Sequence, residues 1–455
     1  MTKKDFKKYM KQGLGRCVLT LKSSDNIEKY KDIVLWGCLH NLSYDTQCEG
    51  TRASYVYELT TYFNDEDYFL VPCIEAFEKN SRKPGWIFAH FAQLLCKFAE
   101  NGNERAINAL KQKYDYLLSV LINKRRFNIY DVEREDFEWI CITLHSILGM
   151  EILLKLVTDM GMLFEKNRHY TGSDFDWFCS TIDECIGEKK LRNLLKRESK
   201  KSEYIATFYQ NYLNVKEEIN NIVHRKPMEV PSAEDIINEL NTNGKLNASS
   251  RVRFFRHSDD SEWRKLAKEI IKEPNLDKKT EMLQFFALGD KAFPLSHEII
   301  IEYSMSKHER LSEVALDVLT NCQSEYVKEY ALQLLTENKY KSQAIEMLLW
   351  NYTSAYKELL LSELNNIKVD YYNESCWHSI GLKILDASKK NIRLPKEFLL
   401  YVYNVTLCSC CREYIVRELA RHRWLTPDII EECRYDSNSD ISAYINRYYP
   451  LNNYK

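Results

Sequence analysis

Short stretches with apolar residues at helical spacing recur through the second half of the chain, from about residue 261 onward. A few polar residues separate each stretch from the next, so we expect a helix about every 13–20 residues and a helix pair about every 30–40. That interval is typical of proteins built from repeated helix pairs. It constrains the fold of this half more strongly than any single motif does.

Glycine and proline are scarce. The 455-residue chain contains 13 glycines and 9 prolines, where average usage predicts about 30 and about 23. Sheet proteins need turn residues at short intervals, and nucleotide-binding α/β folds need glycine-rich loops. The composition therefore predicts an all-α fold. The fragment Gly13-Leu-Gly15-Arg16 lacks the preceding strand and the Lys-Ser/Thr pair of a phosphate loop.

The clearest internal repeat pairs Glu313-Val-Ala-Leu-Asp-Val-Leu319 with Glu329-Tyr-Ala-Leu-Gln-Leu-Leu335. A weaker copy is Glu413-Tyr-Ile-Val-Arg-Glu-Leu419. Both strong copies place a small residue, Ala315 or Ala331, beside leucines on one helical face. A helix that packs between two close neighbours needs this arrangement of small and large side chains.

This E-x-A-L-x-x-L pattern, over residues 308–350, resembles HEAT-repeat proteins, which are armadillo-type α-solenoids. The segment Asn101-Gly-Asn-Glu-Arg-Ala-Ile-Asn-Ala-Leu110 is similar to a HEAT turn with its second helix, and residues 425–441 resemble turns of bacterial HEAT-like arrays. The matches cover about half of the chain. The resemblance implies an α-solenoid of stacked antiparallel helix pairs. The family's usual proline and inter-helix Asp/Arg positions do not recur regularly here.

Three regions are expected. Residues 1–166 form an N-terminal HEAT-like region, 167–250 an irregular helical joint with a basic segment, and 251–455 a C-terminal repeat array. Within the first region, residues 86–122 read as an αα-hairpin that turns at Asn101-Gly102-Asn103, and residues 46–63 read as one helix.

The net charge, the apolar regions and the N-terminus indicate which kinds of partner and which location to expect. The formal net charge is −2, so the whole chain shows no general preference for nucleic acid or a membrane. The longest apolar region, 139–157, is interrupted by His145, Glu151 and Lys155, which favours buried helices and no membrane partner. The N-terminus has no secretory h-region, so we expect a cytoplasmic location and 14 reduced cysteines.

One polar cluster has the spacing of a site. Asp45, Glu49 and Arg52 follow each other at intervals of four and three, which places them on one face of the expected helix, with His40 nearby. Two carboxylates and a guanidinium are suited to acid/base or anion chemistry. The alternative interpretation is an intrahelical ion pair that complements the helix dipole.

Two segments carry many cations. Residues 251–257 read Arg-Val-Arg-Phe-Phe-Arg-His, and cations mixed with aromatic residues are typical of nucleic-acid surfaces. Residues 187–202 form a second basic segment. The alternative is solvated helix surface, with the two phenylalanines in the core. The candidate anion or nucleic-acid contacts are Lys189, Arg192, Arg197, Arg251, Arg253 and Arg256.

The densest cysteine cluster is Cys408-Ser-Cys-Cys411, with His422 and Cys433 further along. A zinc site usually takes two separated pairs of ligands, so we expect a helix start with small buried residues and no metal. No catalytic motif and no cofactor-binding motif is recognisable in the chain, and we therefore predict neither a cofactor nor an enzyme.

These observations favour a non-enzymatic binding or scaffold protein whose solenoid surface holds a protein or peptide partner. The alternative is a nucleic-acid-binding HEAT-like protein similar to the DNA-alkylation-repair glycosylases, which grip the backbone with a basic concave face. A third interpretation, a regulatory or immunity-type bacterial protein that recognises a foreign component, has no residue-level support.

Overall fold

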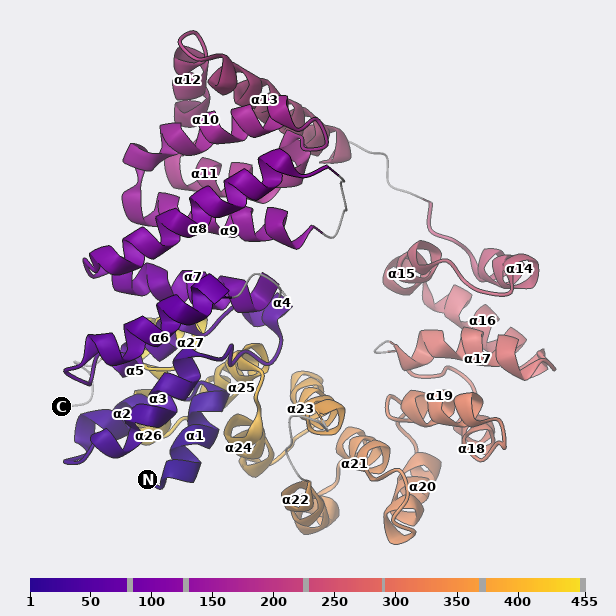
Figure 1. Ribbon diagram of the computed structural model, residues 1–455. Helices are drawn as coiled ribbons and strands as arrows, with labels where there is room; N and C mark the ends of the chain where they lie inside the picture. Colours follow the sequence, from indigo (N-terminus) through magenta and orange to yellow (C-terminus); the bar gives the residue numbers. More distant parts are fainter. Residues whose placement is uncertain (80–84, 126–130, 224–228, 289–290, 368–373, 451–455) are drawn as a thin grey trace. The chain divides into compact units, whose positions relative to one another are not determined.

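The computed structural model describes residues 1–79, 85–125, 131–223, 229–288, 291–367 and 374–450 (Figure 1). These residues form 27 α-helices and three short 3-10 helices, and they contain no strand, which confirms the predicted all-α fold. The chain divides into two compact units. Unit 1 comprises Met1–Arg225, Leu407–Glu413 and Thr426–Lys455, and unit 2 comprises Lys226–Thr406 and Tyr414–Leu425. The division lies within residues 167–250, whereas the return of the C-terminal segments to unit 1 was not expected.

Most helices of unit 1 come from the N-terminal half of the chain. They are α1 (Lys3–Gln12), α2 (Arg16–Ser23), α3 (Lys31–Cys38), α4 (Thr46–Glu49), α5 (Ala53–Thr60), α6 (Glu66–Lys79), α7 (Gly85–Glu100), α8 (Glu104–Asn123), α9 (Val132–Leu148), α10 (Met150–Lys166), α11 (Asp176–Ile186), α12 (Glu188–Glu198) and α13 (Glu203–Val223), with the 3-10 helices η1 (Glu28–Tyr30) and η2 (Gly172–Phe175). Near the C-terminus, α26 (Pro427–Cys433) and α27 (Ser439–Tyr448) complete the unit, together with the first residues of α25 (Ser409–Arg421).

Helices of unit 1 contact their second neighbours along the chain as well as their first. One row consists of α5, α7, α9 and α11, each of which contacts the next, and α6, α8 and α10 form a second row that packs on the first. The predicted hairpin is confirmed: α7 and α8 pack together across Asn101-Gly102-Asn103, and Gly102 adopts a positive φ of 89°. A continuous apolar core runs through the unit from Phe6 to Tyr212.

The expected single helix over residues 46–63 is wrong. Gly50 has φ 67° and ψ −133°, which is not a helical conformation, and it ends α4 after one turn. The chain then re-enters a helix at Ala53, so Asp45 caps α4 whereas Arg52 occupies the cap position of α5. Glycine adopts this positive φ without steric cost, and that freedom overrides the helical spacing of the flanking apolar residues.

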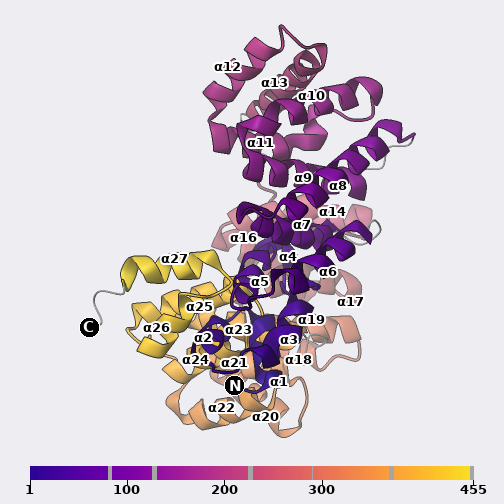
Figure 2. The same cartoon turned by 60° about the vertical axis from the view of Figure 1, so that its left-hand side comes forward.

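Both ends of the chain meet in unit 1. The backbone N–H of Ser437 donates to the carbonyl of Gly13 at 2.8 Å, and Arg16 forms an ion pair with Glu432 at 2.8 Å. Gly15 lies so close to this segment that an added Cβ would stand 1.9 Å from the carbonyl oxygen of Glu432. Figures 1 and 2 show α26 beside α2. The C-terminal segment is therefore part of the N-terminal core.

Unit 2 contains shorter helices that also contact both first and second neighbours: α17, α19, α21 and α23 form one succession, and α18 contacts α20. The internal repeat around Ala315 and Ala331 is buried as expected: Ala315 in α19 and Ala331 in α20 are both fully buried. Its helices are α14 (Ala233–Asn243), α15 (Ala248–His257), α16 (Asp260–Lys272), α17 (Leu276–Ala287), α18 (His297–Ser304), α19 (Glu309–Leu319), α20 (Glu325–Thr336), α21 (Lys341–Trp350), η3 (Ser354–Tyr356), α22 (Lys357–Asn366), α23 (Glu374–Lys389), α24 (Lys396–Val405) and the remainder of α25.

Two further expectations concern apolar helices and thiols. Within the described part of the chain, no helix combines the length and the apolar composition that a membrane crossing requires. The cysteines that the structure describes are all free thiols, and most of them are buried among apolar side chains. They therefore contribute to packing as small apolar groups.

Candidate functional site

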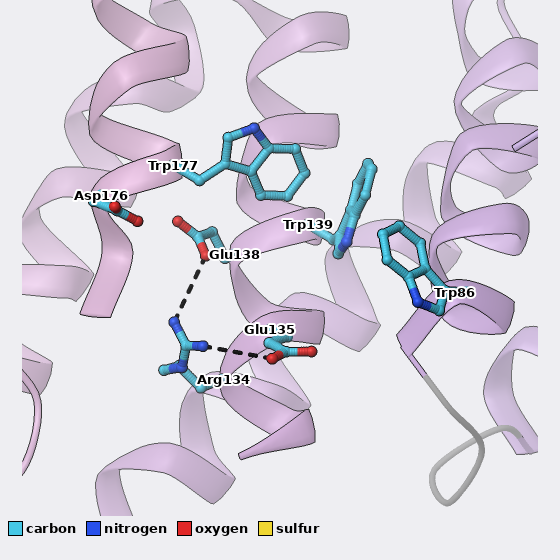
Figure 3. A pocket seen from close by; sticks show the side chains of 7 residues that line it. All are labelled: Trp86, Arg134, Glu135, Glu138, Trp139, Asp176 and Trp177. Carbon is cyan, nitrogen blue, oxygen red and sulfur yellow. Dashed lines mark ion pairs between the residues drawn. The ribbon is translucent and has the colours of Figure 1, made fainter. Parts of the chain in front are cut away.

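An open pocket of about 530 Å³ lies in unit 1 where three helices of the α5–α7–α9–α11 row begin (Figure 3). Its volume is within the usual range of small-molecule and side-chain binding sites. Its lining combines indoles with charged groups: Trp86, Arg134, Glu135, Glu138, Trp139, Asp176 and Trp177.

Most of these side chains come from the first two turns of α9. Arg134 and Glu135 are followed one turn later by Glu138 and Trp139, so helical spacing brings the four to one face. Asp176 and Trp177 stand in the first turn of α11, and Trp86 stands in the first turn of α7. Three successive helices of one row thus present their N-terminal ends to the same pocket.

Two contacts hold α11 in place against α9. Phe175 occupies the N-cap position of α11 and has no side-chain oxygen with which to cap the helix. Glu138 takes over this role, because its Oε1 accepts the backbone N–H of Phe178 at 2.7 Å. The guanidinium of Arg134 donates to the carbonyl of Asp174, just before α11. The position of Trp177 relative to Trp139 therefore depends on two side chains of α9.

The three indoles of the pocket are only partly covered. Trp86 and Trp177 are 37% and 38% exposed, and Trp139 is half-buried. The rings of Trp139 and Trp177 meet edge to face, with centroids 4.3 Å apart and planes inclined at 75°. Figure 3 shows Trp139 between Trp177 and Trp86, with Glu135 and Glu138 on the side of Arg134. The inclined rings of Trp139 and Trp177, together with Trp86, thus form an aromatic surface beside the carboxylates of the pocket.

Burial has the largest effect on the pKa of Glu138. Loss of solvent raises the pKa of this carboxyl to about 7, although the N–H of Phe178 and the guanidinium of Arg134 act in the opposite direction. Asp176 and Glu135 add to the increase through charge repulsion. Arg134 lies 3.9 Å from Glu138 and 3.6 Å from Glu135. Near neutral pH this carboxyl is therefore present in both its protonated and its ionised form.

A second buried acid lies on the same helix. Burial raises the pKa of Asp136 to about 8, while Lys113 opposes the increase. Its Oδ1 makes no hydrogen bond to any residue that the structure describes. Lys113 is also buried and donates to the carbonyls of Phe77 and Glu78 at 3.3 and 3.4 Å. Asp136 thus remains protonated at a pH where exposed aspartates are ionised.

The described lining combines aromatic rings with charged groups. Its ionisable side chains are three carboxylates and one guanidinium. It offers aromatic faces, which bind apolar and cationic groups, and carboxylates, which attract positive charge.

The predicted polar cluster lies in another part of unit 1, with the side chains of Glu49 and Arg52 buried and Asp45 partly exposed. Glu49 and Arg52 form an ion pair at 2.6 Å, and their side chains are 1% and 2% exposed. Arg52 also donates to the carbonyls of Lys11 and Leu407, and Ser409 donates to Glu49 at 2.9 Å. Asp45 accepts the N–H groups of Gln47 and Cys48. These groups connect the N-terminal helices to the segment that starts at Leu407.

The six candidate anion contacts divide between α12 in unit 1 and α15 in unit 2. On α15, Arg251 binds Glu281 at 3.0 Å and Arg253 donates to the carbonyl of Glu229 at 2.8 Å, while Arg256 is exposed. Of the two phenylalanines expected in the core, Phe254 is fully buried and Phe255 is only partly buried.

On α12, Lys189 and Arg192 are exposed, and Arg197 binds Glu198 at 2.7 Å. Across the two helices, acidic side chains or a backbone carbonyl thus engage Arg197, Arg251 and Arg253.

The cysteine cluster starts α25. Cys408 and Cys411 are buried, and the backbone N–H of Cys411 donates to the sulfur of Cys408 at 3.4 Å. Cys433 is buried in unit 1, and His422 belongs to unit 2.

Sequence reasoning missed all seven lining residues of the pocket. The apolar spacing of α9 and the high content of tryptophan were visible, but half-buried indoles are also common in ordinary helix packing. One signal was available. Trp139 and Glu135 lie one turn apart, on a helix that also carries Glu138, although nothing in the sequence indicates that Trp86 and Trp177 join them.

Comparison with known proteins adds no family. No family model and no curated protein matches the chain. One solved structure, the crystal structure of an engineered protein, aligns over 94% of this chain and 96% of its own chain at 13% identity and a TM-score of 0.20. A TM-score of 0.20 does not indicate a shared fold.

Proposed function

We propose that this chain is a non-enzymatic binding protein whose solenoid-type surface holds a protein or peptide partner. The architectural part of the proposal is supported by the contacts between second neighbours. Stacked antiparallel helix pairs produce contacts of this kind. They link α5, α7, α9 and α11 in unit 1, and α17, α19, α21 and α23 in unit 2. Solenoids present such rows as extended binding surfaces.

The observation that carries the proposal is the tryptophan pocket. Tryptophan is the side chain most enriched at binding hot spots, and hot spots lie in pockets where aromatic groups are sheltered from water. Here three successive helices of one row place Trp86, Trp139 and Trp177 around one opening. Exposing an indole to water is unfavourable, so a partner that covers these rings gains binding free energy.

A selection with random displayed peptides tests the proposal. The full chain is immobilised, enriched peptides are synthesised, and their affinity is compared between the wild type and the double variant Trp86→Ala, Trp177→Ala. Both indoles are more than one-third exposed, so we expect the variant to fold, which circular dichroism checks. We expect a loss of affinity of about tenfold or more.

Trp36→Phe is the matched control, because Trp36 is a partly exposed indole of unit 1 that lies outside the pocket. It should leave the affinity unchanged. Failure to enrich any peptide would overturn the proposal, as would peptides that bind the wild type and the double variant equally.

A further inference from the structure

We propose that the tryptophan pocket recognises a quaternary ammonium group, presented by a trimethylated lysine side chain of the peptide partner. This inference rests on the proposed binding function and names the chemical group that the pocket takes. Three features support it: the indole faces, the excess of carboxylates in the lining, and the absence, among the described residues, of a cation over the indoles.

Indole faces are the strongest aromatic binders of cations, and quaternary ammonium ions are held in cages of such rings. The ring planes of Trp139 and Trp177 are inclined at 75°, so they form two walls of a corner. Figure 3 shows Trp86 on the other side of Trp139, where it adds a third aromatic surface. A rounded cation that enters this corner contacts more than one ring.

Among the described residues, no cation lies over these rings. Other aromatic residues of unit 1 carry one: Lys7 lies 4.0 Å from the ring centre of Trp36, and Lys22 lies 3.6 Å from that of Tyr435. Among the described residues, no lysine or arginine lies over Trp86, Trp139 or Trp177. Arg134 lies in the pocket but donates to the carbonyl of Asp174 and faces Glu135 and Glu138.

The charge of the lining favours a cation. Three carboxylates and one guanidinium leave a formal charge of 1 − 3 = −2 when all are ionised. The N-terminus of a helix contributes a partial positive charge of about half a unit. Asp176 and Glu135 lie in first turns and offset this charge, and Glu138 adds a further negative charge when it ionises.

The rings also discriminate between ammonium groups. Oε1 of Glu138 accepts the N–H of Phe178, and Oε2 faces Arg134. Because indole N–H groups only donate, a primary ammonium that leaves water finds no hydrogen-bond acceptor on the rings themselves, which is costly. A trimethylated ammonium donates no hydrogen bond, so it needs no acceptor and binds the aromatic faces through cation–π contacts.

The experiment uses the full chain and two probes of nearly the same shape. Choline carries a trimethylammonium group, and 3,3-dimethylbutan-1-ol is its uncharged carbon analogue. Titration calorimetry and tryptophan fluorescence measure both affinities. We expect choline to bind about tenfold more tightly than the alcohol. Trp86→Ala and Trp177→Ala should each weaken choline binding, whereas Trp36→Phe should not.

A second set of measurements, with peptides, tests whether the cation belongs to a peptide or to a free small molecule. A peptide with one trimethyllysine should bind about tenfold more tightly than the same peptide with lysine, and more tightly than choline, because the backbone adds contacts. Choline that binds as tightly as the peptide would assign the pocket to a free small molecule and overturn the peptide source.

Other outcomes separate this inference from the proposed function. Equal binding of choline and its uncharged analogue would overturn the cation site, and so would binding of cellobiose, a neutral sugar, in place of choline. In both cases peptides that depend on Trp86 and Trp177 would leave the binding function intact. If neither choline nor any selected peptide depends on these indoles, the inference and the proposed function both fail.

Discussion

Arg412 donates hydrogen bonds from Nε and Nη2 to the two carboxylate oxygens of Asp436 at 2.7 and 2.8 Å, and solvent reaches neither side chain. The pair connects the start of α25 to the turn before α27, inside unit 1. A second buried pair, Glu49 and Arg52, lies in the same unit and also binds the segment at Leu407. A buried ion without an oppositely charged partner is strongly destabilising. These pairs therefore fix the position of the C-terminal segment within unit 1.

Asp436→Asn should destabilise the protein by roughly 3–5 kcal/mol, because it leaves the buried guanidinium of Arg412 without a neutralising charge. Urea denaturation followed by circular dichroism measures the change. The double variant Arg412→Met, Asp436→Leu should recover part of the loss, since it removes both charges. Lys79→Ala, which breaks an exposed pair with Glu75, serves as a control and should not shift the midpoint. A negligible effect of Asp436→Asn would contradict the burial of this pair.

Gly15→Ala should loosen the C-terminal segment. Gly15 has an ordinary helical φ of −62°, so the penalty comes from contact alone: the new Cβ would stand 1.9 Å from the carbonyl oxygen of Glu432. We expect faster hydrogen exchange in α26 and α27, measured by mass spectrometry. Gly37→Ala is the matched control, because the nearest atom to its Cβ would be the flexible end of Met10 at 3.0 Å, and Leu42 Cδ1 would lie at an ordinary contact distance of 3.7 Å. Equal exchange in the two variants would refute the close approach.

Stability should decrease as the pH rises through the neutral range. The pKa of Asp136 is raised to about 8 and that of Glu138 to about 7, both by burial. The folded state therefore retains protons that the unfolded chain has already released, so each group lowers the free energy of unfolding by up to roughly 1.4 kcal/mol per pH unit between its two pKa values.

Urea midpoints from about pH 5 to about pH 9 measure this dependence. Asp136→Asn should flatten the upper part of the curve, because the amide does not ionise. A stability that stays constant or increases over this range would show that the two carboxyls are already ionised in the folded protein.

Choline binding should strengthen several-fold between about pH 6 and about pH 8, because ionised Glu138 attracts the cation more strongly than the neutral acid does. The other charged groups that face Glu138 are Arg134, Glu135 and Asp176. Titration calorimetry across the range checks the trend. Glu138→Gln keeps an acceptor for the N–H of Phe178, and its affinity should not vary with pH. A pH-independent affinity in the wild type would exclude Glu138 from the site.

DNA should bind weakly. Arg251, Arg253 and Arg197 are already engaged by Glu281, the carbonyl of Glu229 and Glu198. Fluorescence anisotropy with labelled duplex and single strands, from about 50 to about 200 mM salt, measures the affinity and its salt dependence. A steep decrease of a strong affinity with salt, abolished by Lys189→Ala or Arg256→Ala, would instead support the nucleic-acid alternative.

The local spacing of apolar residues predicted where helices form, but it did not predict where they break. The turn at Gly102 and the burial of Ala315 and Ala331 follow from helical periodicity and from the preference of glycine for positive φ. The same reasoning joined α4 and α5 into one helix, because a periodic apolar face continues across Gly50 even though the backbone there does not. The spacing of Glu49 and Arg52 correctly brought the two side chains together, but it did not indicate that they are buried.

By itself, the sequence determined that this chain is helical, with short connections and amphipathic faces that must pack on one another. Those properties depend on residues within one or two turns of each other. The seating of residues 407–413 and 426–455 in unit 1, and the meeting of Trp86, Trp139 and Trp177 around one pocket, were decided only by the tertiary structure. Their partners lie tens to hundreds of residues apart, and no local periodicity records which distant helix ends come into contact.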